Sequence, residues 1–115
     1  MKVYGIPNCN TVKKARVWLE EHGRTYEFHD YKKQGVPEAL MKKLLEAYGH
    51  ATLINRKGPT WRKLPEDVKA SVVDAATALP VMIANASCIK RPIVEQDDRY
   101  LFGFNETEYE EFFAK

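Results

Sequence analysis

The 115-residue sequence predicts an α/β protein with a mixed sheet and an inserted helical subdomain. Three observations predict this class. The chain opens with strand, helix and strand patterns, continues with a block of helical periodicity, and closes with a predicted hairpin and helix. A strand–helix–strand crossover normally produces a parallel pair, whereas a hairpin contributes antiparallel strands. The length fits a single domain over residues 1–115, with the helical insertion at about 37–87.

The first predicted strand covers residues 2–6 and ends at Pro7. Asn8, Cys9, Asn10 and Thr11 supply several residues able to cap a helix, so a helix is expected to start here. Apolar residues then recur at helical spacing: Val12, Ala15, Trp18 and Leu19. Gly23 suits the end of this helix. The alternating residues 26–31 then predict the second strand.

Cys9 therefore lies where a strand gives way to a helix. The unpaired backbone N–H groups and the positive end of the helix dipole favour an anion at this position. A thiol placed there ionises more readily, and the thiolate is the reactive form. The competing interpretation is a cysteine that merely packs in the interior, which is common for free cysteines. We favour the reactive interpretation.

The central block predicts helices separated by loops. Pro37 suits a first helical turn, and a strong periodic pattern with Gly49 after it runs through Leu40, Met41, Leu44, Leu45 and Tyr48. Residues 55–59 are a loop by composition. Pro65 is expected to open a helix to about Ala76 with Val68, Val72 and Ala75 inward, and Thr77 to cap another helix.

The C-terminal region predicts two strands, at 93–94 and 100–104, joined by a turn at 96–99. Asn105 and Glu108 have the spacing of a capping box and open a last helix that carries Tyr109 and Phe112 on one side. The order β-α-β, helical block, β-β-α, with a cysteine after the first strand, is the layout of a thioredoxin-like domain.

Composition excludes several classes of function. The net charge of +2 is too small to indicate a nucleic-acid or membrane partner, and no apolar run approaches the length of a membrane span. The start of the chain is a strand pattern rather than a signal peptide. Cys9 and Cys88 form no metal-ligand or disulfide-framework pattern, and the three histidines predict no metal site. We expect a cytoplasmic monomer with no bound cofactor and no metal.

Several stretches together resemble the arsenate reductase/Spx family, in particular its small YffB-like branch. The matching stretches span nearly the whole chain: residues 4–15 with Trp18 and Leu19, 30–33, 53–56, 89–94, and 103–104. The resemblance implies a thioredoxin-like fold with a helical insertion. It also implies a catalytic Cys9, with Arg56 and Arg91 as residues that hold an oxyanion beside the thiolate. Pro92 is then expected to follow a cis peptide bond, which is uncommon without a structural reason.

Three departures from the family pattern bear on function. Lys13 stands where the arsenate reductases have an arginine, and lysine lacks the planar fork that grips an oxyanion. A third arginine is expected after the last strand, and residues 103–107 contain none. Val12 occupies the second position of the Cys-x-x-Cys pair common in the Spx branch. The chain therefore presents a one-cysteine site.

The leading hypothesis is a glutathione-dependent thiol–disulfide oxidoreductase that uses Cys9 as its nucleophile, with glutathione as co-substrate. Glutathione carries two carboxylates, which Lys13, Arg56 and Arg91 can bind. Asn10 and Thr11 are candidates for orienting backbone N–H groups towards the sulfur, although helix capping is their simpler role. Two alternatives remain open: an arsenate reductase, and a non-enzymatic Spx-like regulator that binds RNA polymerase. Cys88 is a candidate resolving thiol, but we expect it to be packed and inert.

Overall fold

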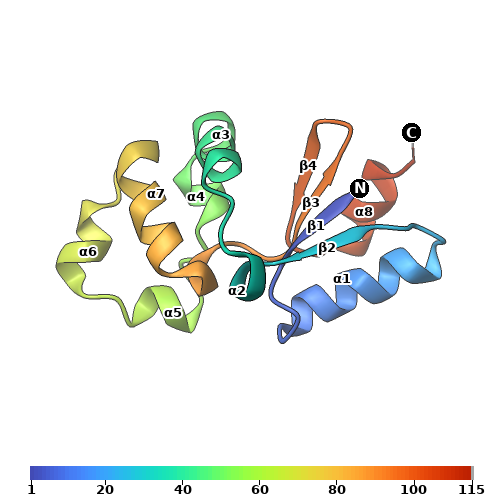
Figure 1. Cartoon of the computed structure of the whole chain (residues 1–115), viewed down its shortest axis with the longest axis horizontal. Helices are drawn as coiled ribbons and strands as arrows, with labels where there is room; N and C mark the ends of the chain where they lie inside the picture. The colour runs from blue at the N-terminus through green and yellow to red at the C-terminus, as the bar shows by residue number, and fades with distance from the viewer. Residues whose placement is uncertain (115) are drawn as a thin grey trace. The chain divides into compact units, whose positions relative to one another are not determined.

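The computed structural model describes residues 1–114, which form two compact units. Unit 1 consists of residues 1–34 together with the C-terminal segment that begins at Arg91. Unit 2 is the intervening segment Gly35–Lys90. Unit 1 contains a sheet with helices, and unit 2 is mainly helical, as the element labels of Figure 1 show.

The sheet of unit 1 has four strands in the order β2-β1-β3-β4. Their bounds are β1 Lys2–Gly5, β2 Glu27–Asp30, β3 Ile93–Gln96 and β4 Arg99–Phe102. Strand β1 pairs with β2 in parallel and with β3 antiparallel, and β3 and β4 are antiparallel. This confirms the parallel crossover and the hairpin that the sequence predicts.

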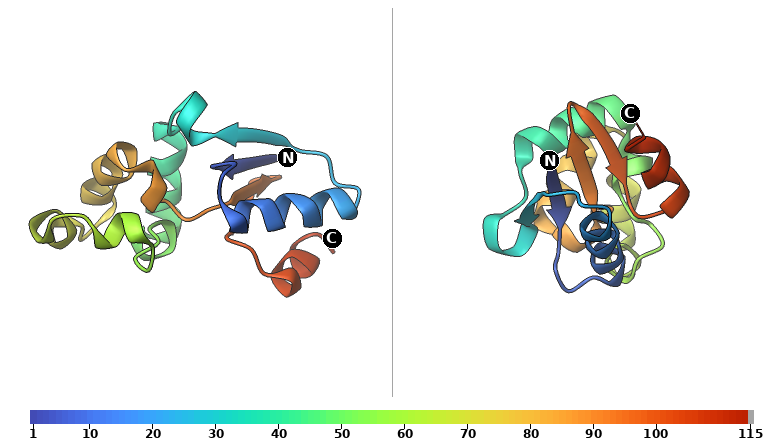
Figure 2. Two further views of the ribbon diagram at one scale, coloured as in Figure 1. Left: turned by 90° about the horizontal axis from the view of Figure 1, so that it is seen from below. Right: turned by 90° about the vertical axis from the view of Figure 1, so that its right-hand side faces the viewer.

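Helices α1 (Asn10–Glu21) and α8 (Glu106–Phe112) pack on the same face of this sheet (Figure 2). The four periodic residues of α1 are its buried face: Val12, Ala15, Trp18 and Leu19. A shared core joins this face to both central strands through Val3 and Val94, and to α8 through Tyr109. The apolar periodicity of the sequence therefore fixes which side of α1 faces the sheet.

The turn and cap chemistry near the C-terminus also follows the sequence. Asp97 and Asp98 connect β3 to β4 with φ values of 52° and 61°, which is the backbone of a tight hairpin turn. The side chain of Asn105 accepts a hydrogen bond of 3.0 Å from the backbone N–H of Glu108. Asn105 is thus the N-cap of α8, as predicted.

Unit 1 also contains the short helix α2 (Tyr31–Gln34), which follows β2 directly. The Asp30 carboxylate accepts a hydrogen bond of 2.9 Å from the Lys32 N–H, and the Gln34 side chain accepts one of 3.1 Å from the Asp30 N–H. These bonds end the strand at Asp30. Tyr31, expected in the strand, is therefore the first residue of a helix.

Unit 2 is built from short helices, and α3 (Glu38–Tyr48) supplies much of its core. Met41, Leu44 and Leu45 are the buried residues of α3, and Pro37 is its N-cap. The other helices are α4 His50–Leu53, α5 Pro59–Arg62, α6 Glu66–Ser71, α7 Ala75–Ala84 and η1 Ala86–Cys88. Within the unit, Ile54 and Ile89 form an isolated antiparallel β-bridge.

The predicted helix boundaries between residues 65 and 77 were wrong. Helix α6 ends at Ser71, and α7 begins at Ala75 with Asp74, not Thr77, as its N-cap. Thr77 is instead the third residue of α7, and its hydroxyl oxygen accepts from the Asp74 N–H while its own N–H donates to the Asp74 carboxylate. This reciprocal pair is a capping box, which starts a new helix where apolar spacing alone suggests continuity.

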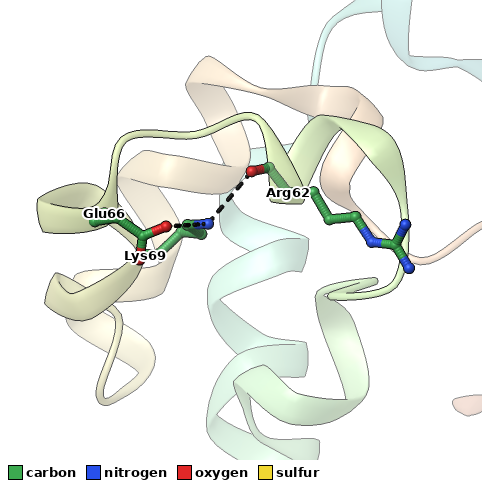
Figure 3. Close-up of polar contacts among 3 residues, drawn as sticks. All are labelled: Arg62, Glu66 and Lys69. Atoms are coloured by element: carbon green, nitrogen blue, oxygen red, sulfur yellow. Dashed lines mark hydrogen bonds and ion pairs between the residues drawn. The ribbon is translucent and has the colours of Figure 1, made fainter.

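An ion pair of 2.9 Å joins Lys69 to Glu66 within α6, and Lys69 also donates to the Arg62 carbonyl at 3.3 Å (Figure 3). The second bond ties α6 to the end of α5.

Residues 50–53 and 59–62, on either side of the predicted loop, form the short helices α4 and α5. The α/β class with a thioredoxin-like mixed sheet and an inserted helical subdomain is confirmed.

Candidate functional site

Cys9 is the N-cap residue of α1, with φ −114° and ψ 129°. The chain reaches it from the end of β1 through residues 6–8, and the Cys9 carbonyl accepts the helical hydrogen bond from the Lys13 N–H at 2.9 Å. Gly5 allows strand and helix to approach closely, because a Cβ there would lie 3.0 Å from the Val12 side chain. The thiol is half-buried rather than enclosed in the core.

The surroundings of Cys9 favour its thiolate. Burial raises the pKa of the thiol, but the backbone N–H groups of Val12 and Thr11 and the Arg91 side chain together outweigh it. The pKa of Cys9 therefore lies below that of an ordinary cysteine. The N-cap position explains the backbone contribution, because the first amides of a helix have no intrahelical partner. The N-cap of α1 is Cys9, one of the four capping residues expected from the sequence, rather than Asn8, Asn10 or Thr11.

Arg91 reaches Cys9 because of the strand register. In the antiparallel pair of β1 and β3, Tyr4 lies opposite Ile93, so residues just before Ile93 lie beside the chain that leaves β1. The Arg91 side chain is hydrogen-bonded to Cys9 and also acts on it through its charge. The peptide bond between Arg91 and Pro92 is cis, as the resemblance implied.

Two further hydrogen bonds connect Pro92 to the segment that follows β4 and to α8. The Gly103 N–H donates to the Pro92 carbonyl at 2.8 Å, and the Tyr109 hydroxyl donates to the Gly103 carbonyl at 2.7 Å. Tyr109 has no exposed surface, and Gly103 has a positive φ of 79°. The segment beside Cys9 is thus linked by hydrogen bonds to the core residue of α8.

Tyr31 is a neighbour of this site that the sequence did not single out. It follows the last residue of β2 and is 2% exposed. Burial raises the pKa of its phenol, Tyr4 raises it further, and the positive charge of Arg91 opposes both. Within residues 1–114 its hydroxyl has no hydrogen-bond partner. A signal was present in the sequence, since a tyrosine at the carboxyl end of a strand parallel to β1 lies near the Cys9 segment.

The other predicted binding residues fall into two groups. Asn10, Thr11 and Lys13 are exposed in the first turn of α1, so they share a helix end with Cys9, and Thr11 contributes through its backbone. Arg56 belongs to unit 2, where it is exposed. Its guanidinium lies 2.8 Å from His50 Nδ1 and 4.9 Å from the ring centre of Trp61. That Arg56 holds an oxyanion beside the thiolate remains a prediction.

Cys88 is a thiol in η1 of unit 2 and is 1% exposed. Its carbonyl accepts a 2.8 Å hydrogen bond from the Asn55 N–H, which holds the backbone at Cys88 and at Asn55 together.

Across residues 1–114, no group of three or more histidine, cysteine or acidic side chains is arranged to hold a metal ion. The described helices also include none long and apolar enough to cross a membrane.

The sheet order, the helical insertion, the thiol at the tip of α1 and the cis-proline beside the arginine that contacts it define a thioredoxin-like protein with a single-cysteine site. Residues 4–112 match the model of the ArsC family. The chain therefore belongs to the ArsC family, which is of the thiol-oxidoreductase type.

The relatives include characterised and uncharacterised proteins. An uncharacterised protein of Haemophilus influenzae is 46% identical over 112 residues, covering 97% of both chains. The Listeria monocytogenes global transcriptional regulator Spx is 27% identical over 115 residues, 98% of this chain and 86% of its own. Among solved structures, a YFFB protein is 44% identical with a TM-score of 0.89, covering 94% of each chain. An arsenate reductase-related protein from Brucella melitensis is 47% identical with a TM-score of 0.76, covering 99% and 94%.

Proposed function

We propose that this chain is a glutathione-dependent thiol–disulfide oxidoreductase in which Cys9 is the only catalytic nucleophile. The observation that carries the proposal is the lowered pKa of Cys9, caused by the amides of Val12 and Thr11 and by Arg91. A lowered pKa increases the thiolate fraction near neutral pH, and the thiolate is the species that attacks a disulfide. The half-buried sulfur is also reachable by a substrate.

The reaction has two exchange steps. The Cys9 thiolate attacks the glutathione sulfur of a mixed disulfide, the original S–S bond breaks, and the substrate leaves as a thiolate that takes a proton from solvent. A glutathione thiolate then attacks the glutathione sulfur on Cys9, which releases oxidised glutathione and restores the Cys9 thiolate. The substrate disulfide is reduced by two electrons, and two glutathione units leave joined as a disulfide.

Cationic side chains supply the binding of glutathione in this proposal. Arg91 holds a carboxylate near the sulfur through charge-assisted hydrogen bonds of its guanidinium. Lys13, one turn into α1, is a second cation near the same helix end. Asn10, Thr11 and Pro92 complete the surroundings of the thiol, and Arg56 is proposed as a further carboxylate-binding residue. No tightly bound cofactor is required, and a reducing cytoplasm supplies the glutathione.

Turnover of a small glutathione mixed disulfide tests the proposal. The full-length protein is incubated with the mixed disulfide of cysteine and glutathione, and oxidised glutathione is measured with a coupled reductase. We expect turnover by the wild type and by Cys88→Ala, and none by Cys9→Ser. A wild-type rate equal to that of Cys9→Ser would refute the proposal.

Arsenate reduction is the second candidate, and the similarity to a structure described as an arsenate reductase-related protein favours it. In this reaction Cys9 attacks arsenate, and glutathione or a small redox protein completes the reduction. Lys13 in place of arginine and the lack of arginine in residues 103–107 both weaken oxyanion binding. We expect no arsenate-dependent consumption of glutathione, and consumption above the arsenate-free rate would favour this candidate.

A regulator that binds RNA polymerase is the third candidate, favoured by the similarity to Spx over nearly the whole chain. Val12 replaces the second cysteine of the redox pair, so Cys9 cannot form an internal disulfide switch with that position. Binding of purified polymerase to the full-length chain, together with no turnover of glutathione disulfides, would favour the regulator over the oxidoreductase.

A further inference from the structure

A groove with a volume of about 550 Å³ lies along α1 in unit 1, between that helix and the segment that connects β4 to α8. Its apolar lining comes from Val17, Trp18 and Phe104. Trp18 is part of the core and is 7% exposed, whereas Val17 is 53% exposed. The groove thus offers apolar contact area that the unit itself does not cover.

The groove leads away from the candidate nucleophile. Cys9, Lys13, Val17 and Glu21 are spaced by four residues, so they follow an inclined row along α1 that turns about 40° around the helix at each step. The last three of them line the groove, and the Lys13 N–H bonds to the Cys9 carbonyl. The groove therefore begins at Lys13, about one helical turn along α1 from Cys9.

The charges of the groove change sign along its length. Lys13 and Lys14 lie at the end nearer Cys9, and Glu21 lies at the far end of α1. Glu106, the first residue of α8, adds a second carboxylate to the lining. All four side chains are exposed, so they are available to a partner.

The length of the groove separates two classes of occupant. From Cys9 to Glu21 the helix axis advances about 18 Å at about 1.5 Å per residue. An extended peptide covers about 3.3 Å per residue, so about five residues span this distance. Glutathione is a tripeptide, and with its sulfur at Cys9 it does not reach Glu21. Its carboxylates would moreover be repelled by that end of the groove.

We infer that the groove along α1 binds the polypeptide segment of a protein substrate whose cysteine is joined to glutathione in a mixed disulfide. The segment carries an apolar side chain over Val17 and Phe104 and a basic side chain about five residues from its cysteine, facing Glu21. This inference rests on the proposed function. It names the substrate class: glutathione-linked proteins with an apolar and a distal basic residue.

In the first exchange step, the bound polypeptide is the leaving group. With the polypeptide held in the groove, Cys9 attacks the glutathione sulfur, the bond between glutathione and the substrate cysteine breaks, and the substrate thiolate is protonated by solvent. Glutathione then resolves the Cys9 mixed disulfide as above. The groove acts on substrate binding, so its contribution appears mainly in KM.

Six-residue peptides joined to glutathione through a terminal cysteine test the inference. Counting the cysteine as the first position, each has leucine at the fourth position and lysine or glutamate at the sixth, and both chain directions are made. With the full-length protein we expect kcat/KM to be about fivefold higher for lysine than for glutamate in at least one direction, and the ratio to shrink in high salt. Glu21→Lys should reverse the preference. The matched control Glu110→Lys, an exposed charge reversal on α8 outside the groove, should keep it.

Binding of peptides with serine in place of cysteine provides a readout without turnover. We expect backbone resonances of α1 to shift on addition of the lysine peptide and less with the glutamate peptide. If the protein turns over the small disulfide but kcat/KM is equal for the two peptides, the inference about the groove is wrong and the proposed function stands. No turnover of any disulfide, with preferential binding of the lysine peptide, refutes the function but supports the groove. Unshifted α1 resonances overturn the groove in either case.

Discussion

The Arg91 side chain is hydrogen-bonded to Cys9, although 82 positions separate the two residues in the sequence. The antiparallel register of β1 and β3 brings them together, because it sets the segment before Ile93 beside the chain leaving β1. An arginine in this position carries a permanent positive charge. The contact therefore stabilises the thiolate over the thiol at every pH at which the protein is folded.

Removal of this charge should raise the pKa of Cys9. In Arg91→Met the helix amides remain, but the hydrogen bond and the charge of the guanidinium are lost. We expect the rate of Cys9 alkylation at neutral pH to fall, and kcat/KM for a glutathione mixed disulfide to fall on the order of tenfold. The pH dependence of alkylation, followed by intact mass, measures both the shift and its direction.

Lys2→Met is the matched control for Arg91→Met. Lys2 is exposed at the opposite end of β1 from Cys9, so its loss removes one positive charge at a distance. Its alkylation profile should overlay that of the wild type. Equal changes in the two variants would mean that net charge, rather than the contact with Arg91, sets the reactivity of Cys9.

Cys88 should play no part in the exchange, because it is 1% exposed within η1. After mild oxidation with oxidised glutathione, we expect the wild type and Cys88→Ala to gain one glutathione each, at equal rates. A wild-type mass lowered by two hydrogens, with no adduct, would instead identify Cys88 as a resolving thiol.

Loss of the Tyr109 hydroxyl should destabilise unit 1. This hydroxyl donates to the Gly103 carbonyl at 2.7 Å in the interior, and the substitution Tyr109→Phe would leave that acceptor without this donor while keeping the ring. We expect Tyr109→Phe to lower the free energy of unfolding by about 1–3 kcal/mol. Urea denaturation measures this change. Tyr26→Phe, which removes a surface hydroxyl bonded to Arg16 and Glu20, should cost less than about 0.5 kcal/mol.

The lowered pKa of Cys9 should make stability depend on pH with a definite sign. Between the folded pKa and the unfolded value of about 8.5, the unfolded thiol binds more protons than the folded one. The thiolate contribution is therefore complete above the unfolded pKa and is lost as the pH falls through the folded pKa. The stability of the wild type minus that of Cys9→Ser should rise with pH across this window. A difference that stays constant would contradict the lowered pKa.

Most of the fold could be predicted from sequence because its signals are local. The apolar spacing of α1 and the Asn105 cap each specify their element within a few residues. The break between α6 and α7 was misplaced because Asp74 and Thr77 act as a reciprocal pair, and Thr77 alone is an equally plausible cap. The short helices α4 and α5 depend on packing in unit 2, with Leu53 and Trp61 as their buried residues.

The candidate site could be predicted only in part. The place of Cys9 at a helix tip follows from the strand and helix patterns around it, whereas the choice of Arg91 came from the family resemblance. Tyr31 and the groove residue Phe104 were missed because strand pairing and the approach of α8 to α1 bring them close to the site. Such juxtapositions leave no periodic signal in the sequence.

The central claim is that Cys9 is held as a thiolate near neutral pH by the tip of α1 and by Arg91. Its most direct test is the pH dependence of Cys9 alkylation in the full-length Cys88→Ala protein, compared with the same titration after unfolding in urea. We predict a midpoint in the folded protein below that of the unfolded chain. A folded midpoint equal to or above the unfolded one would contradict the account.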